Sequence, residues 1–182
     1  MGKRTTTKFK WFWAWQDEAE EKWLGKMSQA GYHLSSIGLP GFYEFTLGKP
    51  VSYVYRMDYQ LFHKKDRTEY LQLFKDAGWE YLGEMSAWQY FRKEAVPGAL
   101  TEIYTDADSK IAKNKRIITY MSIFCLILAV LAVNIPGGIL KNESYPWWSY
   151  IPLAIVISVI TLLLYAIVRL VFRIRQLNRF AR

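Results

Sequence analysis

The chain has 182 residues and a formal net charge of +8, which allows one soluble domain of about 110 residues plus a membrane unit. Residues 1–108 hold 14 Lys and Arg against 15 Asp and Glu, a net of −1. Residues 109–182 hold 10 Lys and Arg against one Glu, a net of +9. The excess positive charge therefore accompanies the C-terminal apolar segments. Because nucleic-acid binding needs a basic groove, we expect no nucleic-acid partner for residues 1–108.

Two copies of one pattern follow each other in residues 8–108, offset by 47 residues. Runs rich in aromatic and β-branched residues predict strands, and an Asp-x-x-Glu start, an apolar stripe and a glycine stop predict helices. The expected strands are 9–15, 32–37, 42–47, 53–59, 79–84, 88–93 and a last one at 102–106, with helices from Asp17 to Gly31 and Asp66 to Gly78. This order predicts an α+β fold, a duplicated strand-helix-strand-strand domain. Its two helices would pack on one mostly antiparallel sheet, similar to ferredoxin-like folds.

Two apolar segments at about 117–139 and 147–172 predict a transmembrane hairpin. Each is long enough, at about 1.5 Å per residue, to cross a hydrocarbon core about 30 Å thick. Helices in lipid approach each other through small side chains. The predicted contact within the hairpin joins one small-residue stripe from each segment: Ser122, Cys125, Ala129 and Ala132 with Ala154, Ser158, Thr161 and Tyr165. In the alternative, the same stripes meet between two subunits of a homo-oligomer.

The charges around the hairpin predict its orientation. Nine Lys and Arg flank the two segments, whereas the connecting loop has only Lys141, offset by Glu143. The positive-inside rule then predicts a multi-pass protein of the cell membrane with both termini in the cytoplasm. The basic tail is either a plain stop-transfer signal or a helix that lies on the lipid surface, and in both cases its lipid-contacting residues are Arg169, Arg173, Arg175 and Arg179.

Five blocks of the N-terminal part resemble an uncharacterised family, the domain of unknown function twenty-eight twelve (DUF2812). The blocks begin at Phe12, Glu21, Ala30, Tyr53 and Ala77 and read FWAW, EKWL, AGYHL, YVYRMDY and AGW. The resemblance spans about residues 8–110. It implies a bacterial cytoplasmic domain followed by membrane helices, often encoded beside PadR-like repressors, in a regulatory or envelope-stress setting. It supplies no catalytic residues.

Two sets of side chains are candidates for binding a ligand or partner. Arg56 and Asp58 are two residues apart on one strand, so they project from one face, where they bind a ligand or form a structural ion pair. Aromatic residues left on an open sheet face would form a binding patch, and the alternative for them is an ordinary core. The candidates for that patch are Trp11, Trp13, Trp15 and Trp88.

Motifs that carry chemistry are scarce in this sequence. His33 and His63 are the only histidines, in different copies of the pattern, and Cys125 is the only cysteine, so we expect no metal or cofactor. The sequence favours a non-enzymatic, membrane-anchored module whose cytoplasmic domain binds a protein partner or a small ligand. An accessory subunit or resistance factor acting within the membrane is the alternative.

Overall fold

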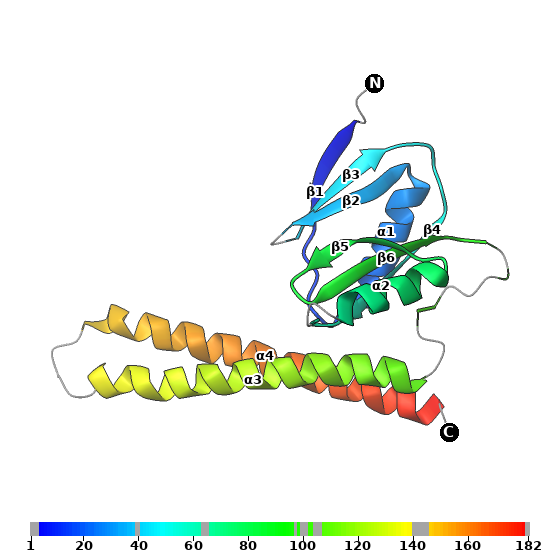
Figure 1. Cartoon of the computed structure of the whole chain (residues 1–182). Helices are drawn as coiled ribbons and strands as arrows, with labels where there is room; N and C mark the ends of the chain where they lie inside the picture. The colour runs from blue at the N-terminus through cyan, green and yellow to red at the C-terminus, as the bar shows by residue number, and fades with distance from the viewer. Residues whose placement is uncertain are drawn as a thin grey trace. The chain divides into compact units, whose positions relative to one another are not determined.

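The computed structural model describes residues 4–38, 41–62, 66–96, 98, 102–103, 107–139 and 146–180. The chain divides into two compact units, Met1–Thr105 and Asp106–Arg182. The first contains β1 (Thr5–Phe9), α1 (Asp17–Gln29), β2 (Tyr32–Gly38), β3 (Phe42–Leu47), β4 (Tyr53–Tyr59), α2 (Asp66–Asp76), β5 (Glu80–Met85) and β6 (Trp88–Glu94) (Figure 1). The second contains α3 (Ala107–Ile139), the short 3-10 helix η1 (Trp147–Tyr150) and α4 (Ile151–Phe180).

The first unit holds two three-stranded antiparallel sheets of the same design. In sheet A, β3 lies between β1 and β2, and in sheet B, β6 lies between β4 and β5. In each sheet the two outer strands are joined by a helix, which makes a split β-α-β unit completed by a hairpin. The glycines that follow the helices, Gly31 and Gly78, have φ angles of 83° and 81°, as a left-handed helix stop requires. The predicted α+β class and the strand-helix-strand-strand order are confirmed.

The sequence pattern predicts one sheet, whereas the structure has two. A single sheet would have to join β2 to β5, which are neighbours but form no ladder among the described residues. Both strands carry a bulge, between Leu34 and Ser36 in β2 and between Tyr81 and Gly83 in β5. A bulge leaves an extra residue unpaired and increases the local twist. Two bulged edges that face each other explain why the sheets stay separate.

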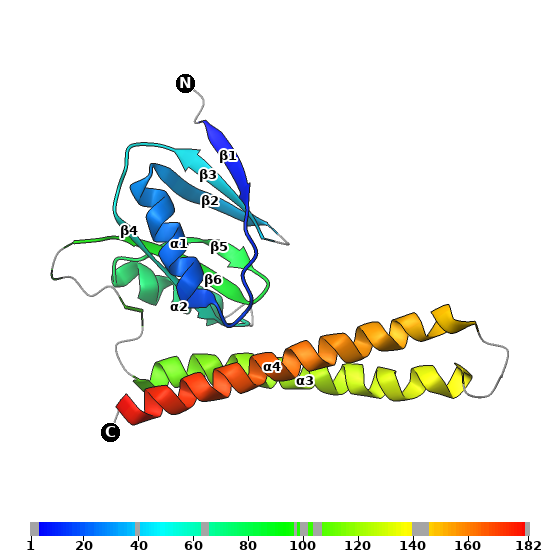
Figure 2. The same cartoon turned by 180° about the vertical axis from the view of Figure 1, so that it is seen from behind.

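The two sheets differ in how they are covered. Trp88, Gln89, Tyr90 and Phe91 of β6 are all at most 8% exposed, so sheet B is buried on both faces. In β3 the buried residues alternate with half-buried ones, so sheet A is buried on one face. Figures 1 and 2 show α2 on one side of sheet B and α1 on the other. The core therefore continues from α2 through sheet B to α1 and sheet A.

Helix α1 covers the outer edge of β4 with polar side chains. Glu21 Oε1 accepts the backbone N–H of Met57 at 2.8 Å, and Ser28 Oγ accepts that of Tyr53 at 3.3 Å. Glu21 is 9% exposed and Ser28 is fully buried. An open strand edge leaves N–H groups without partners. Glu21 supplies an acceptor for the N–H of Met57, and Ser28 adds a second acceptor for that of Tyr53, which also donates to the Val51 carbonyl at 3.2 Å.

Three local expectations were wrong. The first strand is Thr5–Phe9 and not 9–15, because Phe9 pairs with Phe42, the first residue of β3, and the ladder ends there. The Asp-x-x-Glu start of α1 is not a capping box, since Gln16 precedes the helix without a side-chain cap and Glu20 points into the core. Of the last strand, residues 102–103 are irregular, and residues 104–106 lie outside the described residues.

In the second unit, α3 and α4 lie side by side and antiparallel in Figures 1 and 2. The helices Asp108–Asn134 and Trp148–Arg179 contain 18-residue windows with mean hydropathies of 2.3 and 2.8, so both are long and apolar enough to cross a membrane. Met121, Ser122, Cys125, Leu128, Ala129 and Ala132 form the half-buried face of α3, which contains the predicted stripe.

On α4 the predicted stripe was wrong. Ala154, Ser158, Thr161 and Tyr165 are exposed, and the half-buried face is formed by Leu153, Val156, Val159, Ile160 and Leu163. The hydroxyls explain the difference, because Ser158 donates to the carbonyl of Ala154 at 2.8 Å and Thr161 to that of Ile157 at 2.9 Å. A hydroxyl that bonds its own helix needs no partner on the neighbouring helix. Large apolar side chains of α4 therefore meet the small ones of α3.

Candidate functional site

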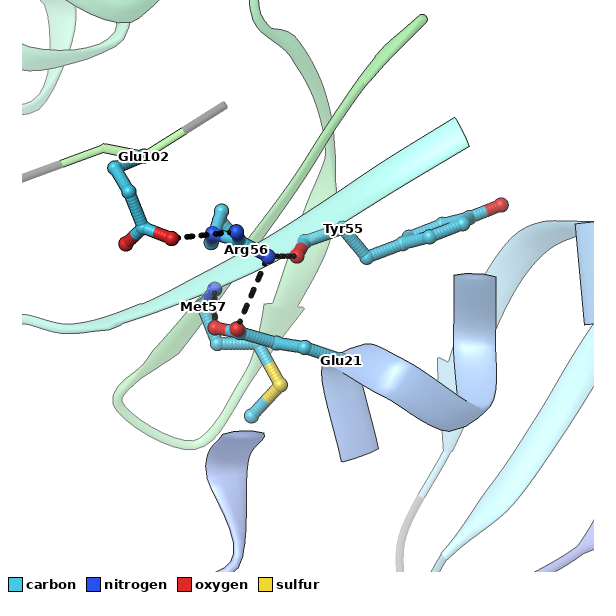
Figure 3. A network of polar contacts seen from close by, with 5 residues as sticks. All are labelled: Glu21, Tyr55, Arg56, Met57 and Glu102. Carbon is cyan, nitrogen blue, oxygen red and sulfur yellow. Dashed lines mark hydrogen bonds and ion pairs between the residues drawn. The ribbon is translucent and has the colours of Figure 1, made fainter. Parts of the chain in front are cut away.

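Arg56 of β4 joins three segments of the first unit (Figure 3). Its guanidinium donates to Glu102 Oε1 at 2.7 Å, to the Tyr55 carbonyl at 2.8 Å and, more weakly, to Glu21 Oε2 at 3.4 Å. Glu21 lies on α1, and Glu102 lies in the segment that follows β6. These bonds direct the cation to protein acceptors, so Arg56 acts as a structural tie.

Asp58 has a separate set of partners. Its carboxylate is 1% exposed and accepts the Tyr70 hydroxyl at 2.8 Å and the Tyr59 backbone N–H at 2.7 Å. Tyr70 lies on α2. Arg56 and Asp58 thus hydrogen-bond to different groups, Arg56 to Glu21, Tyr55 and Glu102 and Asp58 to Tyr70 and Tyr59.

The sequence analysis missed a buried carboxylate between the two sheets. Glu20 of α1 is 4% exposed, and its Oε1 accepts the hydroxyl of Tyr43 at 2.7 Å and that of Tyr90 at 2.8 Å. Tyr43 lies on β3 and Tyr90 on β6. Burial raises the pKa of Glu20, and burial together with the carboxylate raises the pKa of both tyrosines. Both phenols therefore remain donors at neutral pH.

The tryptophans separate into two groups. Trp11 and Trp13 are 50% and 38% exposed and lie in the segment between β1 and α1. Trp13 stacks on Trp15 at 5.3 Å and meets Trp11 edge to face at 5.5 Å. Trp88 on β6 is 8% exposed and packs on Tyr59 at 5.1 Å. The first three therefore form a surface cluster, whereas Trp88 belongs to the core.

A pocket of about 560 Å³ opens where the bulged strands β2 and β5 face each other. The extra residue of each bulge, Ser35 in β2 and Leu82 in β5, lies in its lining. Tyr53 and Tyr81 add aromatic walls. We call this the inter-sheet pocket. Bulges are frequent beside binding sites because they redirect side chains. A bulge on each wall therefore makes this pocket a candidate binding site.

Arg92 of β6 spans the gap between the sheets at this pocket. It donates to both carboxylate oxygens of Glu80, at 2.6 and 2.8 Å, and its third nitrogen lies 3.5 Å from the Leu34 carbonyl of sheet A. Its guanidinium also lies 4.8 Å from the ring centre of Tyr53. The two-point Glu80 pair fixes the orientation of a half-buried cation in the pocket wall.

His33 places a ring nitrogen that lacks a partner in the same region. Its Nε2 lies 2.8 Å from the carbonyl of Lys49, and because a carbonyl only accepts, Nε2 carries the proton. Nδ1 is then an acceptor, and it is buried and without a hydrogen-bond partner among the described residues. Both His33 and Lys49 line the pocket. The sequence analysis gave His33 no role because its pocket neighbours come from distant segments.

The basic residues after the second apolar segment continue α4 to Phe180. Arg169 donates to the Tyr165 hydroxyl at 2.9 Å, and Arg175 lies 5.8 Å from the ring centre of Phe172. Arg169, Arg175 and Arg179 are exposed, whereas Arg173 is half-buried. Three of the four arginines are therefore exposed on one continuous helix. Their role at the membrane surface stays a prediction.

The searched residues, which are those the structure describes, form no group of three potential metal ligands. A family model described as "Protein of unknown function (DUF2812)" matches residues 16–127. This match covers more than half of the chain, from the residue before α1 into the apolar part of α3. Comparisons with curated proteins and with solved structures find no match. The resemblance seen in the sequence is confirmed, and the chain belongs to the DUF2812 family of proteins of unknown function.

Proposed function

We propose that the protein is a non-enzymatic module, held in the cell membrane by α3 and α4, whose first unit binds a small ligand in the inter-sheet pocket. The apolar character of both helices supports the anchor. The basic residues that flank them support an orientation with both termini in the cytoplasm. A regulatory or envelope-stress setting beside a PadR-like repressor stays a prediction from the family resemblance.

The observation that carries the ligand proposal is the combination of groups in the pocket. Arg92 is paired with Glu80 at 2.6 and 2.8 Å, so the ammonium of Lys49 supplies the net positive charge of the pocket lining. Leucine and tyrosine side chains supply apolar walls. A pocket with apolar walls and a few fixed polar groups is the usual form of a small-molecule site. The matching ligand has an apolar body and an anionic end.

A non-enzymatic role is supported by how the buried acids are used. Glu20, Glu21 and Asp58 each accept hydrogen bonds from the protein's own tyrosines or backbone. A general acid or base must instead reach a substrate proton. These carboxylates hold elements of the fold together, so the proposal assigns them to structure.

The ligand is testable by comparing the small molecules that co-purify with the full chain. Leu82→Trp fills the pocket, and Leu61→Trp, at a residue that is 52% exposed and outside the pocket lining, is its matched control. We expect mass spectrometry of the released molecules to detect an anionic compound with the parent protein and with Leu61→Trp, but not with Leu82→Trp. An identical set of compounds from all three proteins would contradict binding in this pocket.

A further inference from the structure

The two halves of the first unit match in strand order and register, so a residue in one half has a counterpart in the other. Phe45 of β3 and Phe91 of β6 each pair with the last residue before the bulge in the neighbouring strand. Each ring also lies near a ring of the helix in its own half, Trp23 at 5.7 Å and Tyr70 at 6.0 Å. Trp23 and Tyr70 are 47 residues apart, the offset of the sequence pattern. Helix α2 therefore corresponds to α1, and sheet B to sheet A.

Within the chain, one face of α1 is buried against sheet B. Glu20 accepts the Tyr90 hydroxyl at 2.8 Å. Glu21 accepts the backbone N–H of Met57, at the sheet edge, at 2.8 Å. Leu24 of the same helix face is fully buried. A helix of the first half thus binds both a face and an edge of the sheet in the second half.

The corresponding face of α2 is less covered. The counterparts of Glu20, Glu21 and Leu24, at an offset of 47 residues, are Arg67, Thr68 and Leu71. Arg67 and Leu71 are half-buried and Thr68 is exposed, whereas their three counterparts on α1 are buried. Thr68 and Leu71 line a groove of about 620 Å³ between α2 and β5. This groove takes the place that sheet B occupies on α1.

The outer edge of sheet A is the counterpart of the edge that α1 covers. Thr7 lies opposite Glu44, and Met57 lies opposite Tyr90. Glu44 and Tyr90 each directly precede the matched phenylalanine, so Thr7 corresponds to Met57. The backbone N–H of Lys10 donates to the carbonyl just before β3, and N–H groups alternate in direction along an antiparallel strand. The N–H of Thr7 therefore points away from β3, to an edge that no described strand pairs.

The outer face of sheet A repeats a ring pair that is covered in sheet B. Phe9 and Phe42 lie 5.1 Å apart on this face. Their counterparts, Tyr59 and Trp88, lie 5.1 Å apart on the face of sheet B that meets α1. Trp88 is 8% exposed, whereas Phe9 and Phe42 are 59% and 45% exposed. Sheet A therefore leaves uncovered the surface by which sheet B packs on α1.

We propose that sheet A of one copy of the chain packs on the α2 groove of a second copy, as sheet B packs on α1 within the chain. The counterpart of the Glu20–Tyr90 bond then joins Glu44 to Arg67 of the other copy, two opposite charges. The Glu44 carboxylate has no hydrogen bond or ion pair with the described residues, and the Arg67 side chain is 43% exposed beside Glu84. Two different surfaces meet, so the association is head to tail. It is independent of the ligand proposed for the inter-sheet pocket.

Two positions of the groove differ from α1. Gln72 stands in place of Gly25, but a Cβ at Gly25 would lie 3.4 Å from the Tyr53 carbonyl oxygen, an ordinary contact. The amide of Gln72 bonds its own helix at 2.6 Å. Lys75 stands in place of Ser28, so the hydroxyl bond at that end of the strand has no counterpart. The contact between copies is therefore centred on Glu44 and Arg67.

The test co-expresses two full chains with different affinity tags, both with Cys125→Ser. One carries Thr7→Cys and the other Thr68→Cys, so every product of a short bifunctional thiol reagent joins two chains. Glu69→Cys, at the exposed next residue of α2 and outside the groove lining, is the matched control for Thr68→Cys. We expect the 7–68 product to form several-fold more than the 7–69 product.

The charges are tested in the same pair of chains. Glu44→Arg in the Thr7→Cys chain brings two cations together, so the 7–68 yield should fall at least about threefold. Adding Arg67→Glu to the Thr68→Cys chain should restore the yield, which a misfolded chain would not do. Glu18→Arg, at an exposed residue of α1, should leave the yield unchanged.

Each other outcome overturns the inference. A 7–68 product no stronger than the 7–69 product would mean that sheet A does not meet the α2 groove. A predominant product between two Thr7→Cys chains would mean that two β1 edges pair with each other instead. A yield that Glu44→Arg does not lower, or that Arg67→Glu does not restore, would show that these two residues do not face each other between copies.

Discussion

Glu20 accepts hydrogen bonds from two tyrosines that belong to different sheets, so one carboxylate couples the two halves of the first unit. The offset between Tyr43 and Tyr90 is the 47 residues of the sequence pattern. The repeated pattern gives the two tyrosines this spacing, but it does not indicate that both donate to the same carboxylate. The Asp-x-x-Glu pattern predicts Glu20 as part of a helix start, because an acid at the last position of that motif usually bonds the backbone there.

The raised pKa of Glu20 predicts how stability depends on pH. A carboxyl whose pKa is higher in the folded state than its unfolded value of 4.5 favours folding when protonated. This contribution is complete below the unfolded pKa and is lost as the pH rises through the folded pKa. Glutamine keeps an oxygen for the two phenols but does not titrate. Raising the pH from about 4 to about 8 should therefore lower the stability of the parent relative to Glu20→Gln.

Urea unfolding of the full chain across this pH range measures the effect. Glu18→Gln, at an exposed position on the same helix, is the matched control and should follow the parent. A Glu20→Gln profile parallel to that of the parent would show that the carboxyl titrates normally. The structural interpretation of Glu20 would then be wrong.

Arg56 shows how far sequence reasoning reaches at this scale. The spacing of two correctly places Arg56 and Asp58 on one face of β4, because strand geometry fixes that relation. The spacing does not predict which residues Arg56 and Asp58 bond. Glu21 is 35 residues away from Arg56 and Glu102 is 46 residues away, and these contacts exist only once α1 and the segment after β6 have packed. Long-range partners of this kind decide between a ligand site and a structural tie.

At the scale of elements, α1 acts as the cover of a strand edge. Glu21 and Ser28 are seven residues, about two turns, apart on the helix, and they bond β4 at Met57 and Tyr53. The helix thus runs along the edge and blocks pairing with another chain there. This accounts for two buried polar residues on a helix whose stripe was expected to be apolar.

Removing one of these acceptors tests the edge cover. Ser28→Ala removes the Oγ acceptor and leaves the N–H of Tyr53 only the Val51 carbonyl, at 3.2 Å, and the loss of one such hydrogen bond costs about 0.5–1.5 kcal/mol. We expect a loss of stability of this size in urea unfolding of the full chain, with faster hydrogen exchange at the Tyr53 amide. Ser36→Ala, at an exposed position of β2, should change neither quantity. Unchanged exchange at Tyr53 in Ser28→Ala would show that the hydroxyl does not protect this edge.

The pairing of α3 with α4 was predicted correctly for one helix and not for the other. Small residues marked the correct face of α3, because that face must allow close approach. The same rule failed on α4, where Ser158 and Thr161 satisfy their hydroxyls within the helix. Periodicity predicts that a face exists, whereas the choice between two candidate faces depends on the partner.

Cysteine crosslinking tests the observed seam. The native Cys125 is half-buried on α3. Oxidation should join it within one chain to Ile160→Cys or Leu163→Cys, on the half-buried face of α4, more efficiently than to the exposed neighbours Thr161→Cys or Leu162→Cys. Gel mobility under non-reducing conditions distinguishes intrachain from interchain products. Preferential disulfide formation with positions 161 and 162 would contradict the observed contact face of α4. Products formed only between chains would indicate an oligomer.

At the scale of the whole molecule, the first unit consists of two halves that resemble each other in strand order. Both halves have the same strand order and a bulge in the strand after the helix. The halves differ in how far their central strands are buried, since β6 is buried on both faces and β3 on one. The sequence therefore predicts the elements of each half, and the separation into two sheets arises where the bulged edges meet. The pocket lies at that junction, which explains why no single sequence motif indicated it.

The orientation of the hairpin is the last prediction. Nine Lys and Arg flank the apolar segments on the side of the termini, against Lys141 in the loop, so both termini should face the cytoplasm. On a Cys125→Ser background, a membrane-impermeant maleimide applied to intact cells should label Asn142→Cys and not Asp108→Cys. Lysed cells are the control and should label both. Labelling of Asp108→Cys alone in intact cells would reverse the orientation. The basic flank would then face outward, and the ligand proposed for the first unit would have to be sought outside the cell.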